Sequence, residues 1–415
     1  MKLLHTSDWH LGHTLHGLSR ELEHEAFLAW LLDTIVARGA DAVVVAGDVF
    51  DSANPPASAQ RMFYRFLAEA RRRCPRLDLV VVAGNHDSAS RLEAPTPLLA
   101  GLGIHVVGAL ARTADGRLDL DRLLVPLGEA GGEAAAWCLA IPFLRPADLW
   151  GAGPEAGDPL IGAVRVVYEE AVSRARERIG RSPALVVTGH LYMVGGLVSE
   201  LSERKVFGGN QHALPADLFG PEVAYAALGH LHLAQTVGGR ETLRYSGAPL
   251  PLSLEEGSYP HQVVEVELAA GVPVRVEPIR VPRTVEVLRV PPGGGEPPEA
   301  VLAALQSLEL DEALPPGRWP YLEVRVRLVR PEPGLRRQVE DALDGRPVRL
   351  LKITPAYAGS GRTLPEVTPA RGLQEITPDE VFRLRYRQRH QGEPPPALLD
   401  AYHALLEQVQ LGGEA

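Results

Sequence analysis

The stretch Asp41-Ala-Val-Val-Val-Ala-Gly-Asp-Val-Phe-Asp51 decides the fold of this 415-residue chain. Its run of small and β-branched residues, 42–46, predicts a strand of a parallel sheet that is buried on both faces. Gly47 then allows the backbone to turn sharply and to present the carboxylate of Asp48 at the carboxyl end of that strand. Open α/β sheets carry their chemistry at this edge, so the stretch predicts the position of a site as well as the fold.

Four further apolar runs end in the same way, on Asp, Asn or His. We expect the five strand ends to lie in one sheet. Divalent metals accept carboxylate, amide and imidazole ligands. The sequence therefore predicts a metal site made by Asp8, His10, Asp48, Asn85, His190, His230 and His232.

Two metal ions about 3.5–4 Å apart can clamp a phosphate and activate water, and such a pair needs a shared carboxylate. Asp48 follows the central strand and is the candidate for this role. Asp8 and His10 would flank it from one neighbouring strand, where extended geometry points both side chains to one side. Asn85 would flank it from the other.

Composition limits what else the chain can be. Its net charge of −10 argues against a general electrostatic affinity for nucleic acid, so DNA binding must rely on metal ions, a local arginine surface or a basic partner. Cys74 and Cys138 are too few for a disulfide scaffold or a zinc cluster. No apolar stretch approaches the roughly 20 residues of a membrane span, so we expect neither export nor membrane insertion, and a cytoplasmic location.

The apolar periodicity predicts an α/β fold with two packed mixed sheets flanked by helices. The second sheet is expected from the segments 105–107 and 137–143. Helix 57–74 is more apolar than one core-facing stripe requires, so part of its surface is a possible contact with another subunit. The other predicted elements are strands 2–6, 77–83, 184–188 and 223–228, helices 20–38 and 164–179, and a closing hairpin of 262–268 and 274–280.

Beyond Pro282 a β-α-β-α-β run without a ligand cluster predicts a small separate domain. Its predicted elements are 284–290, 298–308, 321–329, 334–343 and 348–353. Two further helices are expected at 378–390 and 396–411. The predicted organisation is a first domain with the metal site at 1–281, the small separate domain at 282–357, a linker at 358–376 and C-terminal helices at 377–415.

The motifs together resemble those of the calcineurin-like metallophosphoesterases. They are Asp8-Trp-His10, Gly47-Asp-Val-Phe-Asp51, Gly84-Asn-His-Asp87, Gly189-His190 and Gly229-His-Leu-His232. More narrowly, Ser7-Asp-Trp-His-Leu-Gly12, Pro55-Pro56 and Ile141-Pro-Phe-Leu-Arg-Pro146 are similar to the bacterial SbcD family of nuclease subunits. The resemblance covers essentially the whole chain, because that family also has a capping domain and terminal helices that dock on an ATPase.

The resemblance implies how the site is divided. One metal would be held by Asp8, His10, Asp48 and His232, and a second by Asp48, Asn85, His190 and His230. Mn²⁺ is the expected metal, with Mg²⁺ as the alternative. His86 would contact the scissile phosphate and assist the leaving oxygen, and Asp87 would orient His86. His13, near the mouth of the site, and Arg145 are further possible substrate contacts.

The resemblance also implies a DNA exonuclease and endonuclease that acts on DNA ends, hairpins and single strands in repair and recombination. The family is gated by an SbcC-type ATPase. None of the three lysines lies in a Gly-Lys-Ser/Thr context, so this chain is expected to bind no nucleotide and the ATPase must be another polypeptide. Segments 57–74 and 91–102 correspond to the family's dimer contact, which implies a homodimer within a heterotetramer.

Three alternatives share parts of this pattern. Phosphoprotein phosphatases typically have Arg and Glu where this chain has Ser52 and Asp87. A phosphodiesterase acting on a small nucleotide would need neither the extra domain nor the terminal helices. A scaffold that has lost its metals predicts an apolar residue at one of the ligand positions, and all seven carry ligand-type side chains.

Overall fold

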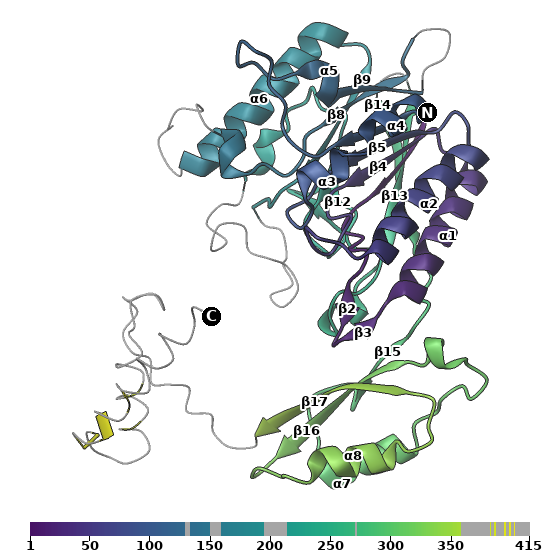
Figure 1. The fold of residues 1–415 in the computed structure, drawn as a ribbon, viewed down its shortest axis with the longest axis vertical. Helices are drawn as coiled ribbons and strands as arrows, with labels where there is room; N and C mark the ends of the chain where they lie inside the picture. Colours follow the sequence, from purple (N-terminus) through teal and green to yellow (C-terminus); the bar gives the residue numbers. More distant parts are fainter. Residues whose placement is uncertain are drawn as a thin grey trace. The chain divides into compact units, whose positions relative to one another are not determined.

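The computed structural model describes residues 1–128, 133–149, 159–194, 214–269 and 272–357, with a few single positions between 382 and 402 (Figure 1). The chain divides into two compact units, residues 1–356 and 357–415. Apart from those single positions, the predicted linker 358–376 and the predicted helices 378–390 and 396–411 lie outside the described residues. In the described part of the chain, no helix combines the length and the apolar character that crossing a membrane requires.

The first sheet has six strands in the order β14-β13-β1-β4-β5-β6. Strands β1, β4, β5 and β6 run parallel, and the predicted hairpin of β13 and β14 closes the sheet antiparallel to β1. The strands are β1 (Lys2–Thr6), β4 (Ala42–Ala46), β5 (Asp78–Val82), β6 (Ile104–Val107), β13 (Gln262–Ala269) and β14 (Val272–Arg280).

The second sheet also has six strands, in the order β11-β12-β10-β9-β8-β7. They are β7 (Leu124–Leu127), β8 (Ala136–Ala140), β9 (Ala184–His190), β10 (Tyr225–Gly229), β11 (Gln235–Val237) and β12 (Arg240–Tyr245). Two predictions about the sheets were therefore wrong. The strands that lead to His190 and His230 belong to the second sheet, whereas β6 pairs with β5 in the first. Apolar runs predict that strands exist, but the pairing partner is set by packing across the sheet, which periodicity does not encode.

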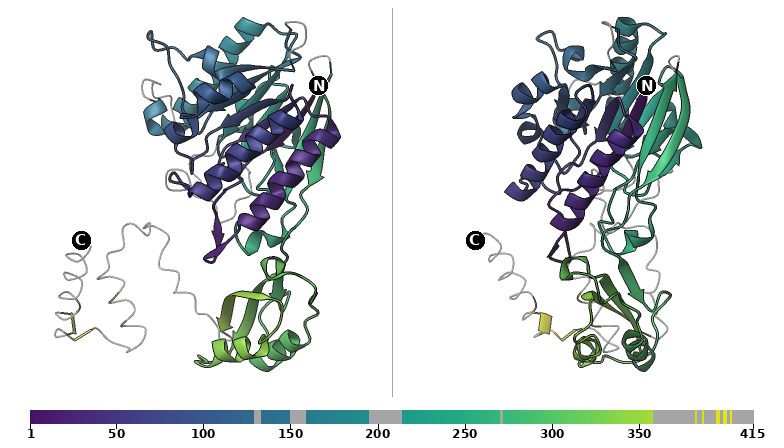
Figure 2. Two further views of the ribbon diagram at one scale, coloured as in Figure 1. Left: turned by 45° about the vertical axis from the view of Figure 1, so that its right-hand side comes forward. Right: turned by 90° about the vertical axis from the view of Figure 1, so that its right-hand side faces the viewer.

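Strand β4 shows how the layers form. Val44 packs into the core between the two sheets, together with residues of β9 and β10. Val43 and Val45 point the other way, into a second core shared with helices α1 (Glu21–Arg38) and α2 (Ala57–Arg73). These two helices run side by side over that face (Figures 1 and 2). Helix α6 (Pro159–Ile179) packs its buried residues into the first core.

Much of the apolar surface of α2 is used inside the chain. Phe63 and Phe66 are buried against the ring of Trp9, whose centroid lies 6.3 and 5.3 Å from theirs. Met62 and Leu67 are buried in the same cluster. The excess of apolar residues in the sequence therefore reflects a helix that also covers the loop after β1.

Residues 287–357 form the predicted β-α-β-α-β run, which we call the cap. Its three strands have the order β15-β16-β17, and β15 runs parallel to β16. Helices α7 and α8 pack on this sheet (Figure 2), and the cap has a hydrophobic cluster of its own. Its elements are β15 (Val287–Val290), α7 (Pro298–Gln306), β16 (Tyr321–Leu328), α8 (Leu335–Ala342) and β17 (Arg349–Tyr357).

Strands β7, β11 and β12 of the second sheet were not predicted from the sequence, and neither were the smaller elements of the described residues. They are β2 (Thr14–Leu15), β3 (Leu18–Ser19), α3 (Ala89–Glu93), α4 (Thr96–Leu99), α5 (Leu120–Leu123) and 3-10 turns at Ala100–Leu102, Pro146–Leu149, Ala216–Leu218, Glu255–Ser258 and Pro316–Arg318.

Candidate metal centre

The carboxyl ends of five strands from both sheets meet at one place. Asp8 and His10 follow β1, Asp48 follows β4, and Asn85 follows β5. His190 is the last residue of β9, and His230 and His232 follow β10. Because strands in each group run parallel, their carboxyl ends face the same way. The metal-ligand candidates lie between two sheets rather than along the edge of one.

Left-handed backbone conformations mark the same residues. Among the described residues, five other than glycine have a positive φ, and four of them are Asp8, His10, Asp48 and His230 (54°, 45°, 49° and 106°). The prediction that extended geometry aims Asp8 and His10 was therefore wrong, because a tight turn after β1 does so. Such conformations cost about 1–3 kcal/mol each and cluster at functional sites.

Two glycines allow the strand ends to approach this closely. A Cβ on Gly84 would overlap the backbone nitrogen and the carboxylate of Asp48. A Cβ on Gly229 would overlap the carbonyl oxygen of Ala46. The loops that carry Asn85 and His230 could not pack against β4 with larger residues at these positions.

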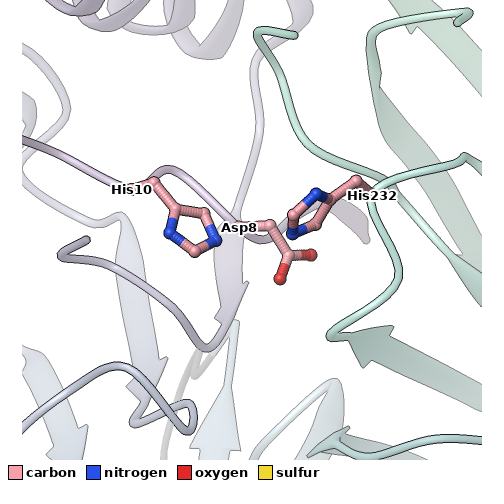
Figure 3. Close-up of side chains that lie close together, drawn as sticks. All are labelled: Asp8, His10 and His232. Carbon is pink, nitrogen blue, oxygen red and sulfur yellow. The ribbon is translucent and has the colours of Figure 1, made fainter. Parts of the chain in front are cut away.

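One group of ligand atoms comes from Asp8, His10 and His232, which lie within 4.8 Å of one another. In Figure 3 the imidazoles of His10 and His232 flank the carboxylate of Asp8. A second group surrounds Asn85, whose Oδ1 lies 2.9 Å from Nε2 of His190 and 3.1 Å from Nδ1 of His230.

Asp48 stands between the two groups. Its Oδ2 atom lies 3.5 Å from Nε2 of His10 and 3.3 Å from Nε2 of His190. The other oxygen, Oδ1, accepts a hydrogen bond of 2.8 Å from the backbone nitrogen of His86. This fixes the plane of the carboxylate, with Oδ2 turned toward the imidazoles of both groups.

Burial and charge set the protonation of this centre. Burial alone would raise the pKa of Asp48, but His190 outweighs it and holds that pKa well below its usual range. Burial alone would lower the pKa of His190, and the Asp48 carboxylate instead raises it to about 9. Without a metal ion, the two therefore form a buried ion pair in which His190 carries the proton.

The neighbouring groups respond differently. Burial raises the pKa of Asp8, and it lowers the pKa of His230 to about 3 with a contribution from the charge of His190. A divalent cation would compensate the charge of both carboxylates and displace the proton of His190.

Two of the imidazoles are held through their Nδ1 atoms by carboxylates. Nδ1 of His10 lies 3.2 Å from Oδ1 of Asp51, and Nδ1 of His232 lies 3.0 Å from Oε1 of Glu256. Such partners fix the tautomer and orientation of a ligating histidine. Sequence reasoning assigned no role to either residue. Asp51 could have been found from its place in the Asp48 motif, but Glu256 follows His232 by 24 residues and carries no sequence signal.

His86 lies at the rim of the centre and is 9% exposed, more than the buried Asp8, His10 and Asp48. Its Nδ1 atom lies 2.8 Å from the carbonyl oxygen of Asp51, and its ring centroid lies 4.7 Å from that of His10. The structure thus places His86 beside the metal-ligand candidates. Contact between His86 and a phosphate stays a prediction.

The carboxylate of Asp87 accepts hydrogen bonds from the backbone nitrogens of Val49 (3.1 Å), Phe50 (2.9 Å) and Gly84 (2.8 Å). It therefore joins the loop after β4 to the loop after β5. Burial and the charge of Asp48 raise its pKa to about 6. An orienting role of Asp87 toward His86 stays a prediction.

Arg145 and His13, the two further predicted substrate contacts, lie near the centre. The guanidinium of Arg145 donates to the carbonyl oxygens of Asp87 (2.9 Å) and Gly84 (3.4 Å), so it holds both ends of the loop that carries Asn85 and His86. The backbone nitrogen of His13 donates to the carbonyl oxygen of His10 (2.9 Å). Burial lowers the pKa of the His13 ring to about 4. Substrate contact by either residue stays a prediction.

The donor set fits a divalent metal site. Its ligand-type atoms are carboxylate, amide and imidazole groups, a mixture that first-row divalent metals accept. The Nε2 atom of His10 is buried and has no hydrogen-bond partner among the described residues, although Oδ2 of Asp48 is close. A buried nitrogen of this kind, next to a carboxylate, is where a metal ligand is expected.

Comparisons with known proteins agree with this geometry. The model of the calcineurin-like phosphoesterase family matches residues 1–234, and a model described as the type 5 capsule protein repressor C-terminal domain matches residues 281–390. Proteins named as the SbcD component of the SbcCD nuclease are similar over most of the chain. The one from Rhodobacter capsulatus is 44% identical over 92% of this chain and 93% of its own length. The one from Escherichia coli K12 is 33% identical, over 93% and 92%. These matches confirm the family and the fold class, and the chain belongs to the SbcD family of nuclease subunits within the calcineurin-like phosphoesterases.

Proposed function

We propose that this chain is the nuclease subunit of an SbcC–SbcD-type complex and hydrolyses DNA phosphodiester bonds at two divalent metal ions. Its substrates would be double-stranded ends, hairpins and single strands, in repair and recombination in the cytoplasm. The name that the relatives share, SbcD of the SbcCD nuclease, supports the nuclease activity and the SbcC-type ATPase partner. The observation that carries the two-metal site is the Oδ2 atom of Asp48, which lies within 3.5 Å of imidazoles from both groups of ligand atoms.

In this proposal, Asp8, His10, Asp48 and His232 hold one ion, and Asp48, Asn85, His190 and His230 hold the other. When bound, the two ions would stabilise charge on the phosphate and lower the pKa of the attacking water. Four imidazoles among seven ligands favour Mn²⁺ over Mg²⁺, because Mg²⁺ prefers oxygen donors. Besides holding the two ions, the chain's own residues position the substrate.

His86 is proposed to contact the scissile phosphate. Its backbone nitrogen is bonded to Asp48, and its Nδ1 atom is bonded to Asp51, so the position of the ring is fixed relative to the ligands. With the Nδ1 proton held by the Asp51 carbonyl, the opposite nitrogen Nε2 is the atom that can exchange a proton with the leaving oxygen.

The assembly is proposed from the family. A homodimer would form through α2 and residues 91–102, where Leu98 and Leu102 are 78% and 44% exposed. Residues 377–415 would dock on the ATPase partner. The domain boundaries in this proposal are those predicted from the sequence, after residues 281, 357 and 376. A partner with positive charge would also offset the net charge of −10, which opposes DNA binding.

Purified full-length chain, incubated with linear duplex, hairpin and single-stranded DNA and Mn²⁺, Mg²⁺ or chelator, tests the activity. We expect cleavage with Mn²⁺ and none with chelator. A cyclic nucleotide and a phosphopeptide serve as competing substrates, and faster turnover of either would contradict the DNA assignment.

His86→Ala tests the division of roles. We expect near-normal Mn²⁺ binding and a loss of cleavage of about 100-fold or more. His105→Ala is the matched control, because His105 is a half-buried residue near the amino end of β6, away from the carboxyl ends that carry the metal-ligand candidates. Equal loss of Mn²⁺ binding and cleavage in His86→Ala would contradict these roles.

A further inference from the structure

A line of buried polar contacts begins in the cap at Tyr321, the first residue of β16. Its hydroxyl donates a hydrogen bond of 2.8 Å to Oε2 of Glu23, in the first turn of α1. The Tyr321 side chain is buried in a small cluster with Leu15, Leu254 and Val285. The cap thus contacts the catalytic domain through a hydroxyl that is enclosed by apolar side chains.

Glu23 also contacts Arg20, which lies immediately before α1. Nε of Arg20 donates to Oε2 of Glu23 (2.8 Å), and Nη2 donates to Oε1. Both side chains are at most 3% exposed, so this is a buried ion pair. Loss of one partner would leave an uncompensated charge, which ties the two groups to each other.

The remaining guanidinium nitrogen of Arg20, Nη1, donates to the carbonyl oxygen of Pro251. The next backbone nitrogen, that of Leu252, donates 2.8 Å to Oε2 of Glu256. These two atoms belong to one peptide group, which is planar and rigid. A rotation of this peptide that breaks one of the bonds therefore disturbs the other.

Glu256 completes the line. It is fully buried, and its second oxygen lies 3.0 Å from Nδ1 of His232. The cap holds the same segment at another point, because Arg289 of β15 donates to the carbonyl oxygen of Leu254. The segment 251–256 is thus fixed to the cap on one side and to a metal-ligand candidate on the other.

We propose that Glu256 is a positioning residue for His232 and that the docked cap holds it in place through Tyr321, Glu23, Arg20 and the Pro251–Leu252 peptide. With the cap docked, His232 is aligned with Asp8 and His10. When the cap moves, the peptide and Glu256 shift, and metal binding by these three residues weakens. Hydrogen bonds in such a chain also polarise one another. This inference rests on the proposed role of His232 as a metal ligand.

Mn²⁺ binding to the full-length, chelator-treated chain tests this, with free Mn²⁺ measured by electron paramagnetic resonance. We expect Glu256→Gln to weaken binding of one of the two ions about 10- to 100-fold, as loss of a ligand's hydrogen-bond partner does. Tyr321→Phe removes only a hydroxyl at the far end of the line and should weaken binding of the same ion about 2- to 30-fold. Tyr64→Phe, in α2, removes a hydroxyl outside this line and should leave binding unchanged.

The double variant separates a connected line from two independent effects. Once Glu256 is changed, the effect of Tyr321→Phe on Mn²⁺ affinity should largely disappear. Thermal unfolding in chelator measures the purely structural contribution. A Tyr321→Phe variant that unfolds at lower temperature but binds Mn²⁺ like the wild type would overturn the inference, and so would an equal effect of Tyr321→Phe in both backgrounds. A wild-type chain that binds no Mn²⁺ would instead overturn the metal assignment itself, and this inference with it.

Discussion

The carboxylate of Asp51 holds the outer nitrogen of His10, with Oδ1 3.2 Å from Nδ1. The inner nitrogen, Nε2, consequently faces Oδ2 of Asp48. Burial alone would raise the pKa of Asp51, but its hydrogen bond with His10 lowers that pKa below the usual value. One short loop after β4 therefore supplies both the shared ligand candidate and the group that aims a second ligand at it.

We expect Asp51→Ala to weaken Mn²⁺ binding about 10- to 100-fold, because His10 would lose the partner that fixes its tautomer. Asp51→Asn should recover part of this loss, since its amide oxygen can still accept from Nδ1. Isothermal titration with Mn²⁺ measures both. Asp344→Ala removes the same charge from an exposed position in the cap and is the control. Identical affinities for Asp51→Ala and wild type would show that Asp51 does not position His10.

Substitution of Gly84 is a second test, because Gly84 lets the loop after β5 approach the loop after β4 closely. Gly84→Ala would place a methyl group on the carboxylate and backbone nitrogen of Asp48. We expect it to lower the free energy of unfolding by about 1–3 kcal/mol and to weaken Mn²⁺ binding, because the two loops must separate. Urea unfolding and Mn²⁺ titration measure these effects. Gly101→Ala is the control, since a Cβ there meets nothing within 4 Å. Unchanged Mn²⁺ affinity in Gly84→Ala would mean that the loops can separate without moving Asp48.

The variant Arg145→Lys tests whether Arg145 holds the loop or contacts the substrate. Its Nη2 atom donates to two carbonyl oxygens of the loop that carries Asn85 and His86, and its planar guanidinium lies 5.6 Å from the centre of the Phe143 ring, a placement that the lysine ammonium does not reproduce. We expect Arg145→Lys to lower kcat about 10- to 100-fold through misplacement of His86, with little change in KM for DNA. Arg117→Lys, in an exposed turn, is the control. A variant that raises KM and leaves kcat intact would indicate phosphate binding instead.

The sequence predicted what depends on local order along the chain. Polar residues after apolar runs identified the strand ends, and helix α1 ends where Gly39 adopts a left-handed conformation (φ 61°). The predictions failed where partners are distant in sequence. No periodicity shows that β9 pairs with β10 in a separate sheet or that Glu256 reaches His232. The turn after β1 was also missed, because positive φ at Asp8 and His10 is imposed by packing against the Asp48 loop rather than by glycine.

His5 gives a test of pH dependence outside the metal centre. It is fully buried in β1, where its ring nitrogens lie 3.0 Å from the hydroxyl of Tyr225 and 3.1 Å from the carbonyl oxygen of Leu228. Burial lowers its pKa from 6.5 to about 3, so the folded chain holds it neutral. An unfolded chain binds the proton near pH 6.5, and this contribution to stability is therefore full above that pH and is lost as the pH falls toward 3.

Between pH 7.5 and 5.5, this single group should lower the free energy of unfolding by about 1.4 kcal/mol. His5→Gln keeps a hydrogen-bonding side chain but does not titrate, so its stability should fall less over the same interval by that amount. Urea unfolding in the presence of chelator, at both pH values, measures the difference without a contribution from bound metal. His16→Gln is the matched control, because the His16 side chain is exposed. A pH dependence in His5→Gln equal to that of the wild type would mean that the pKa of His5 is not lowered in the folded chain, and it would contradict a neutral, buried His5.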